Sequence, residues 1–291
     1  MNSPSASWNP IWDLRQLLAY PFMVQALAAG TIVAVLAGAV GWYMVLRRQT
    51  FAGHTLSTMA FPGAAAGLLL ALPGALGYYL ACGVAAVVLA RRPDAHDSQG
   101  GIQSARIGTV QAVGLAAGFV LLAMSHGVLG GLDGLLFGSF LGVTDTQVWV
   151  LAAVAALILG ILVVIGRPLL FASLDPEAAA ARGVPVRALE IGFMLVLGVT
   201  VAAATQITGA LLVFAVLVSP AATAQRVAGR PIASMIASVG CAVAIVWLSL
   251  ACAYFSPYPL GFFTTTFAFL AYAAARWVRI PRRRQAREVP A

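Results

Sequence analysis

Long apolar runs follow one another along almost the whole chain, and they constrain the fold more than any other feature. An α-helix needs about 20 apolar residues to cross the hydrocarbon core of a bilayer. Runs of this kind predict helices over residues 18–46, 54–72, 75–90, 107–125, 148–165, 188–204, 207–224, 231–255 and 260–278. The sequence therefore predicts an all-α, polytopic membrane helical bundle of about nine transmembrane helices, within a range of roughly eight to ten.

Composition supports the same fold class. The 291 residues are 61% hydrophobic and 9% charged, whereas a soluble domain carries about 25% charged residues. We therefore expect a single integral membrane domain over 1–291, with a short N-terminal tail at 1–17 and an arginine-rich tail at 279–291. The first residues lack the basic start and short apolar core of a cleaved signal peptide, so we expect the first span to direct insertion.

Arginine placement predicts the orientation. All 17 basic residues are arginines, and most lie at the ends of apolar runs, as the positive-inside rule requires of cytoplasmic loops. The pattern predicts an N-terminus outside, a C-terminus inside, and a glycine-rich segment at 131–143 that does not cross. The same placement argues against nucleic-acid binding, which the net charge of +8 would otherwise suggest.

Polar residues stand at the head of one apolar run, within the stretch RRQTFAGHTLSTMAFPG at 47–63. His54, Ser57 and Thr58 are spaced i, i+3 and i+4, so a helix places them on one face, where they could line a polar path. Pro62 and Gly63 follow and favour a bend. The alternative is that the two hydroxyls bond to their own helix backbone and His54 lies near the headgroups.

A short helix outside the membrane is predicted between two spans, at 175–183. Asp175 suits the N-cap, Pro176 the first helical position, and alanines continue the helix until Gly183 ends it. The other polar segment, at 91–106, reads as a flexible loop. Its His96, between Asp94 and Asp97, could hold a divalent ion but is better explained as a solvated turn, and His126 needs no special role at the membrane interface.

Catalytic motifs are missing. The chain contains no HExxH, no GxSxG and no glycine-rich GK[ST] loop, so we expect no catalytic site and no ATP bound by this chain.

Four blocks, in this order, resemble the integral membrane permease subunit of the metal-type ABC importers, which carry zinc, manganese or iron(II). The blocks are LRRQTFAGHTLSTMAFPG, LFGSFLGVT, RPLLFASLDPEAAAARGVPV and TGALLVFAVLVSPAATA, and the resemblance covers about residues 25–278. It implies the permease fold of that family in a bacterial cytoplasmic membrane.

The resemblance also implies roles for particular residues. Gly53, His54 and Ser57 match the family's first block, while Thr58 stands where the family generally has a histidine. His54, with Ser57 and Thr58, is therefore expected to meet the metal in transit. The third block resembles the family's coupling segment, which docks on the ATPase subunit. The residues expected to make that contact are Asp175, Pro176, Glu177, Ala179, Arg182 and Gly183.

The implied protein is the membrane-spanning subunit of an ATP-driven importer for divalent transition metals, with zinc preferred over manganese or iron(II). It would form the path as a homodimer and work with two copies of an ABC ATPase, which use the ATP, and with an extracytoplasmic metal-binding protein. The alternative is a secondary transporter of a metal or small molecule, which would need no ATPase and would usually show internal repeats. A structural or assembly role in the membrane is a third class.

Overall fold

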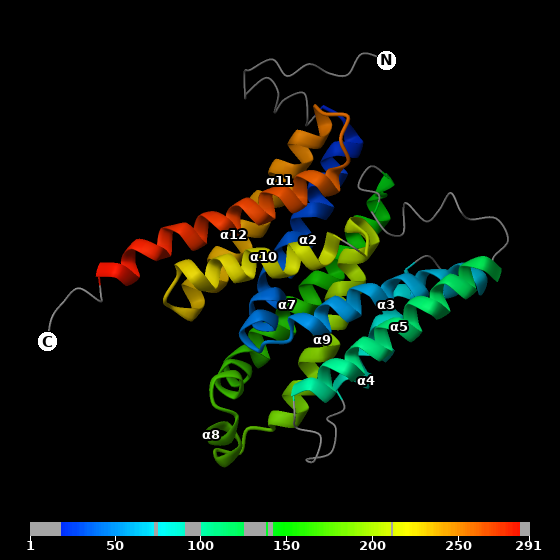
Figure 1. Ribbon diagram of the computed structural model, residues 1–291. Helices are drawn as coiled ribbons and strands as arrows, with labels where there is room; N and C mark the ends of the chain where they lie inside the picture. The colour runs from blue at the N-terminus through cyan, green and yellow to red at the C-terminus, as the bar shows by residue number, and fades with distance from the viewer. Residues whose placement is uncertain are drawn as a thin grey trace, which may run out of the picture. The chain divides into compact units, whose positions relative to one another are not determined.

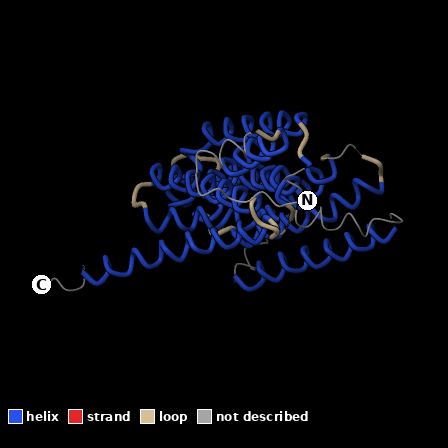
Figure 2. Tube along the Cα trace, turned by 90° about the horizontal axis from the view of Figure 1, so that it is seen from above, coloured by secondary structure: helices blue, strands red, loops and turns tan. Residues whose placement is uncertain are grey.

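The computed structural model describes residues 19–72, 75–90, 100–124, 138, 142–210 and 212–285. Helices joined by loops and turns make up this part of the chain, and none of its residues is in a strand (Figure 2). The all-α prediction is confirmed.

Ten helices follow one another in the described part of the chain (Figure 1). They are α2 (Pro21–Leu46), α3 (Thr50–Leu69), α4 (Leu76–Ala90), α5 (Gly100–Met124), α7 (Asp145–Leu174), α8 (Pro176–Ala181), α9 (Val186–Thr208), α10 (Leu212–Val227), α11 (Pro231–Tyr254) and α12 (Leu260–Gln285).

Five of the described helices are long and apolar enough to cross a membrane: α2, α5, α7, α9 and α11. The apolar helices α4 and α10 are shorter, and α3 has the length but not the hydropathy, because polar residues interrupt it. A multi-pass membrane bundle is thus confirmed, whereas the count of nine spans and their orientation stay predictions. The segment 131–143 lies outside the described residues except for Gly138, Gly142 and Val143.

The chain divides into two compact units. The first contains residues 1–42, 140–152 and 215–291, and within it α2 packs closely on α11. The hydroxyl of Ser238 donates to the carbonyl oxygen of Gly38 (2.8 Å), and the indole N–H of Trp42 donates to the hydroxyl of Ser234 (2.9 Å). Small residues allow such close backbone approach in membrane proteins, and these hydrogen bonds join the two helices.

The second unit contains residues 43–139 and 153–214, with α3 packed against α4, α5 and α9. Figure 1 shows α3 and α5 running side by side. Gly63 of α3 and Gly77 of α4 lie so close that a β-carbon on either would collide with the backbone of the other. Fourteen of the 20 residues of α3 are buried, so α3 is a core helix of this unit.

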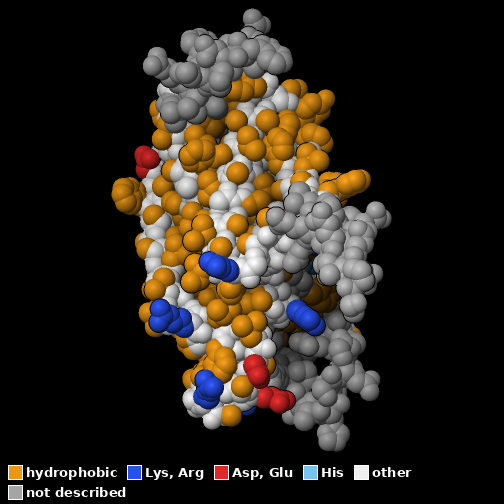
Figure 3. Space-filling view, turned by 90° about the vertical axis from the view of Figure 1, so that its left-hand side faces the viewer, with side chains coloured by type: hydrophobic (Ala, Val, Ile, Leu, Met, Phe, Trp, Pro, Cys, Tyr) orange, Lys and Arg blue, Asp and Glu red, His pale blue; other side chains and the backbone are white. Residues whose placement is uncertain are grey.

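Other helices of the second unit turn large apolar side chains outward. On α5 these are Val113, Phe119 and Val120, and on α7 they include Val163 and Val164, all more than half exposed. Hydrophobic side chains cover most of the described surface in the view of Figure 3. An apolar surface of this extent is typical of a protein embedded in a membrane, as the composition predicts.

Candidate functional site

His54 lies in the second turn of α3 and reaches neighbouring helices. Its Nε2 atom is 3.5 Å from the amide nitrogen of Gln111 on α5. Its ring packs edge-on against the ring of Phe214 at the start of α10, with centroids 4.9 Å apart. The Nδ1 atom is buried and has no hydrogen-bond partner among the described residues. His54 therefore carries a covered nitrogen that no described residue of this unit uses.

Gln111 is also linked to Thr55, the neighbour of His54. The Thr55 hydroxyl lies 3.4 Å from the amide oxygen of Gln111 and 3.2 Å from the carbonyl oxygen of Phe51. Sequence analysis missed both Thr55 and Gln111. The signal that could have found Gln111 is a lone amide inside the apolar run GTVQAVGLAAG, where a polar side chain needs a partner.

Ser57 and Thr58 bond within α3. The Ser57 hydroxyl donates to the carbonyl oxygen of His54 (2.7 Å), and the Thr58 hydroxyl donates to that of Thr55 (2.8 Å). Both residues are buried. This is the backbone bonding considered above as the alternative, and it leaves each hydroxyl oxygen with lone pairs but no free proton. Of the three side chains on this face, His54 is the one with a described polar contact to another helix.

A resident metal centre is not built within the described residues. They contain no group of three or more His, Cys, Asp or Glu side chains that could hold an ion. The candidate donors near His54 are one imidazole nitrogen and hydroxyl or amide oxygens, which suit a brief contact with an ion in transit rather than storage. His96, Asp94, Asp97 and His126 lie outside the described residues.

Arg47 ties the start of α3 to two other helices of the same unit. Its guanidinium donates to the hydroxyl of Ser173 on α7 (2.9 Å) and lies over the ring of Phe193 on α9, 5.4 Å from its centroid. The turn that connects α2 to α3 is therefore held to the end of α7. Ser173 lies two residues before Asp175, the N-cap of α8.

The short helix predicted at 175–183 is present as α8. A side-chain oxygen of Asp175 accepts a hydrogen bond from the backbone N–H of Ala178 (2.9 Å), and Pro176 occupies the first turn. Gly183 has a φ of 78°, which an L side chain rarely adopts. The guanidinium of Arg182 lies 5.6 Å from the ring centroid of Phe171 at the end of α7.

The residues of this segment differ in exposure. Ala179 is fully buried, and α8 packs on α9 of its own chain. Asp175, Pro176, Glu177, Arg182 and Gly183 are exposed. Ala179 therefore holds α8 in place and offers no surface to another subunit in this conformation, whereas the five exposed residues do.

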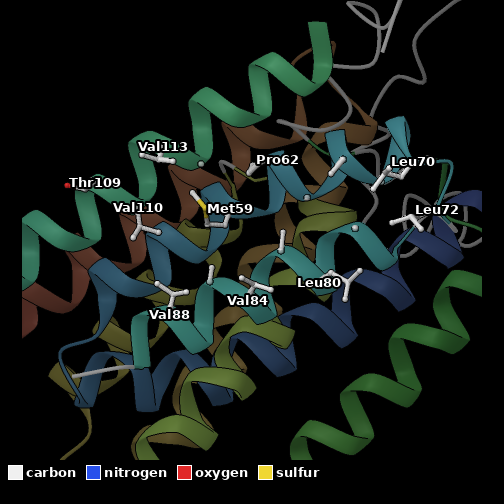
Figure 4. Close-up of a pocket in the computed structure, with 17 residues that line it drawn as sticks. Met59, Pro62, Leu70, Leu72, Leu80, Val84, Val88, Thr109, Val110 and Val113 are labelled. Carbon is white, nitrogen blue, oxygen red and sulfur yellow. The ribbon is translucent and has the colours of Figure 1, made fainter. Parts of the chain in front are cut away.

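An apolar groove of about 620 Å³ opens between α3, α4 and α5 (Figure 4). Met59 and Pro62 of α3, Leu80 and Val84 of α4, and Val113 of α5 are among its lining residues. Thr109 is the one lining residue with a polar side chain, and its hydroxyl bonds to the carbonyl oxygen of Ala105 (2.9 Å). This lining offers an ion almost no ligands.

Comparison with known proteins identifies relatives along most of the chain. The manganese transport system membrane protein MntC of Halalkalibacterium halodurans is 30% identical over 223 residues, which cover 76% of this chain and 75% of that protein. The high-affinity zinc uptake system membrane protein ZnuB of Haemophilus influenzae is 27% identical over 213 residues, covering 73% and 80%. The structure of PsaBC from Streptococcus pneumoniae in complex with Fab matches with a TM-score of 0.83 at 26% identity, covering 94% of this chain and 97% of that one.

The ABC 3 transport family matches residues 19–279, almost the whole described region. The match agrees with the absence of catalytic motifs, because a permease contains no ATP site of its own. It also removes the case for a secondary transporter or an assembly protein. The chain belongs to the ABC 3 transport family and is a non-catalytic, multi-pass membrane permease of the metal-type ABC importers.

Proposed function

We propose that this permease carries zinc across the bacterial cytoplasmic membrane in an importer driven by ATP, with His54 as the residue that meets the ion. The observation that carries the proposal is the covered Nδ1 of His54, which has no hydrogen-bond partner in the described part of the chain and lies on a polar face of a core helix. Imidazole nitrogen is a preferred ligand of zinc, while manganese favours oxygen ligands. Ser57 and Thr58, one turn further along α3, supply hydroxyl oxygens on the same face.

Manganese is the second candidate, because relatives at 30% identity are named as manganese transport proteins. The hydroxyl and amide oxygens near His54 would suit manganese better than the imidazole nitrogen does. Iron(II) ranks after both. A relative at 27% identity is named for zinc uptake and supports zinc as the first candidate.

The complete importer contains two copies of this chain around a two-fold axis, two copies of an ABC ATPase, and an extracytoplasmic metal-binding protein. The exposed residues Asp175, Pro176, Glu177, Arg182 and Gly183 on and beside α8 form the contact with the ATPase. Ala179 supports that contact from beneath by docking α8 on its own chain.

Uptake of radioactive zinc and manganese by cells expressing the complete importer tests this function. His54→Ala is expected to lower uptake of the transported metal on the order of tenfold at limiting concentration, as for loss of a metal-site contact. Thr109→Ala is the matched control, because the Thr109 hydroxyl is exposed and its bond within the described residues goes to Ala105 of its own helix. Undiminished uptake of both metals by the assembled His54→Ala complex would show that His54 does not contact the transported ion.

A further inference from the structure

We infer that Gln111 is a positioning residue that holds the proton of His54 on Nε2 and thereby leaves Nδ1 as the nitrogen that binds the metal. The metal-binding part rests on the proposed function, whereas the placement of the proton does not. Gln111 and His54 come from α5 and α3, 57 positions apart in the chain, and both side chains are partly buried.

The amide of Gln111 can meet His54 in two orientations, because its oxygen and nitrogen ends have the same shape. In the first orientation, the amide nitrogen donates to Nε2 of His54 across 3.5 Å. A neutral imidazole then carries its proton on Nδ1. That N–H would be a buried donor without an acceptor among the described residues, which folded proteins strongly avoid.

In the second orientation, the amide oxygen accepts the proton of Nε2, and the amide nitrogen donates to the hydroxyl of Thr55. The Thr55 hydroxyl can receive this bond because its own proton goes to the carbonyl oxygen of Phe51, at 3.2 Å, which is nearer than the 3.4 Å to Gln111. The ring proton of His54, the hydroxyl proton of Thr55 and one of the two amide protons of Gln111 then each have an acceptor. What remains unused is the lone pair of Nδ1.

An unused lone pair on a covered imidazole nitrogen is the group that a cation binds. Histidines that ligate metals nearly always donate their other N–H to an oxygen, which fixes both the ring and the proton. The amide oxygen of Gln111 fills that position here. Because Nδ1 is covered in this structure, an ion reaches it only when the side chains around the ring separate.

The proton position can be read directly by nitrogen NMR of the full-length permease, labelled with ¹⁵N-histidine and embedded in lipid nanodiscs. The chain has three histidines, so His96→Asn and His126→Asn leave His54 as the only signal. We expect a protonated Nε2 and a bare Nδ1 in this background. Adding Gln111→Leu should give a mixture of both tautomers, while Gln111→Glu, which also presents an oxygen to Nε2, should restore a single one.

Gln206→Leu is the matched control, because Gln206 is equally part-buried but bonds to the carbonyl oxygen of Ala202 in its own helix (3.1 Å) and to the side chain of Tyr79 on α4 rather than to His54. It should leave the spectrum unchanged. A proton on Nδ1 in the Gln111-containing protein, or an identical spectrum after Gln111→Leu, overturns the inference.

Zinc uptake by the complete importer adds the functional half. Gln111→Leu is expected to raise the KM for zinc about tenfold with little change in the maximal rate. Gln111→Glu is expected to bring the KM most of the way back. If the spectrum of Gln111→Leu changes as expected but uptake does not, the placement by Gln111 stands and the metal contact of His54 under the proposed function fails. Loss of uptake without any change of tautomer overturns the positioning role itself.

Discussion

The helices α3 and α8 belong to the same unit, yet they obtain their structure in opposite ways. α3 is 20 residues long, mostly buried, and packed against α4, α5 and α9. α8 has six residues, and the residues that begin and end it, Asp175 and Gly183, lie next to it in the sequence. The environment of α3 is thus set by distant parts of the chain, and the ends of α8 are set by its immediate neighbours. Changes in α3 contacts should affect the whole unit, whereas changes at the two ends of α8 should stay local.

The largest effect is expected where α3 meets α4. Gly77→Val would drive a side chain into the backbone of Gly63, and neither helix can shift without losing its other contacts. Overpacking costs about 1–3 kcal/mol and occasionally more, and the clash here is with backbone atoms, so we expect little folded permease in size-exclusion chromatography of the detergent-solubilised protein. Gly83→Val on the same helix is the control, since no described atom lies within 4 Å of a β-carbon added there. Equal yields of the two variants would show that the contact between α3 and α4 is not a determinant of folding.

A smaller and more selective effect is expected from two arginines placed on α8. Ala179→Arg puts a large charged side chain at a buried position and should undock α8 from α9. Ala180→Arg changes an exposed position and should leave α8 in place. Both are expected to lower metal-stimulated ATP hydrolysis of the assembled complex by about fivefold or more, the range of a lost coupling between sites.

Thermal unfolding separates the two α8 variants. Ala179→Arg should lower the midpoint temperature of thermal unfolding of the permease, and Ala180→Arg should leave that temperature unchanged. If Ala180→Arg keeps normal stimulated hydrolysis and transport, the exposed side of α8 does not contact the ATPase.

The smallest effect is expected at the cap of α8. Asp175→Ala removes the side-chain acceptor of the Ala178 N–H and should cost about 1 kcal/mol of local stability. Asp175→Ser restores an acceptor and serves as the control. Hydrogen exchange at the amides of 176–181 should accelerate in the alanine variant alone, with exchange in α3 unchanged. Faster exchange in both helices would mean that α8 is not locally determined.

The contrast also explains what the sequence could predict. The apolar runs predicted a membrane bundle, because a run of that length has few other stable environments. Asp175, Pro176 and Gly183 predicted α8, because capping acts over three or four residues. The contact of His54 with Gln111 could not be predicted, since it depends on which helices become neighbours. The inward side of Ala179 was missed for the same reason: a run of alanines does not reveal which one faces the chain.

Arg47 gives the two helices a mechanical connection. Its hydrogen bond to Ser173 and its contact with Phe193 join the turn before α3 to the helices that precede and follow α8. If a displacement of α8 also moves α7, either the first turns of α3 move with α7 or the contacts of Arg47 with Ser173 and Phe193 break. His54 lies seven positions beyond Arg47. A movement passed on through Arg47 would therefore reach α3 within two helical turns of the imidazole.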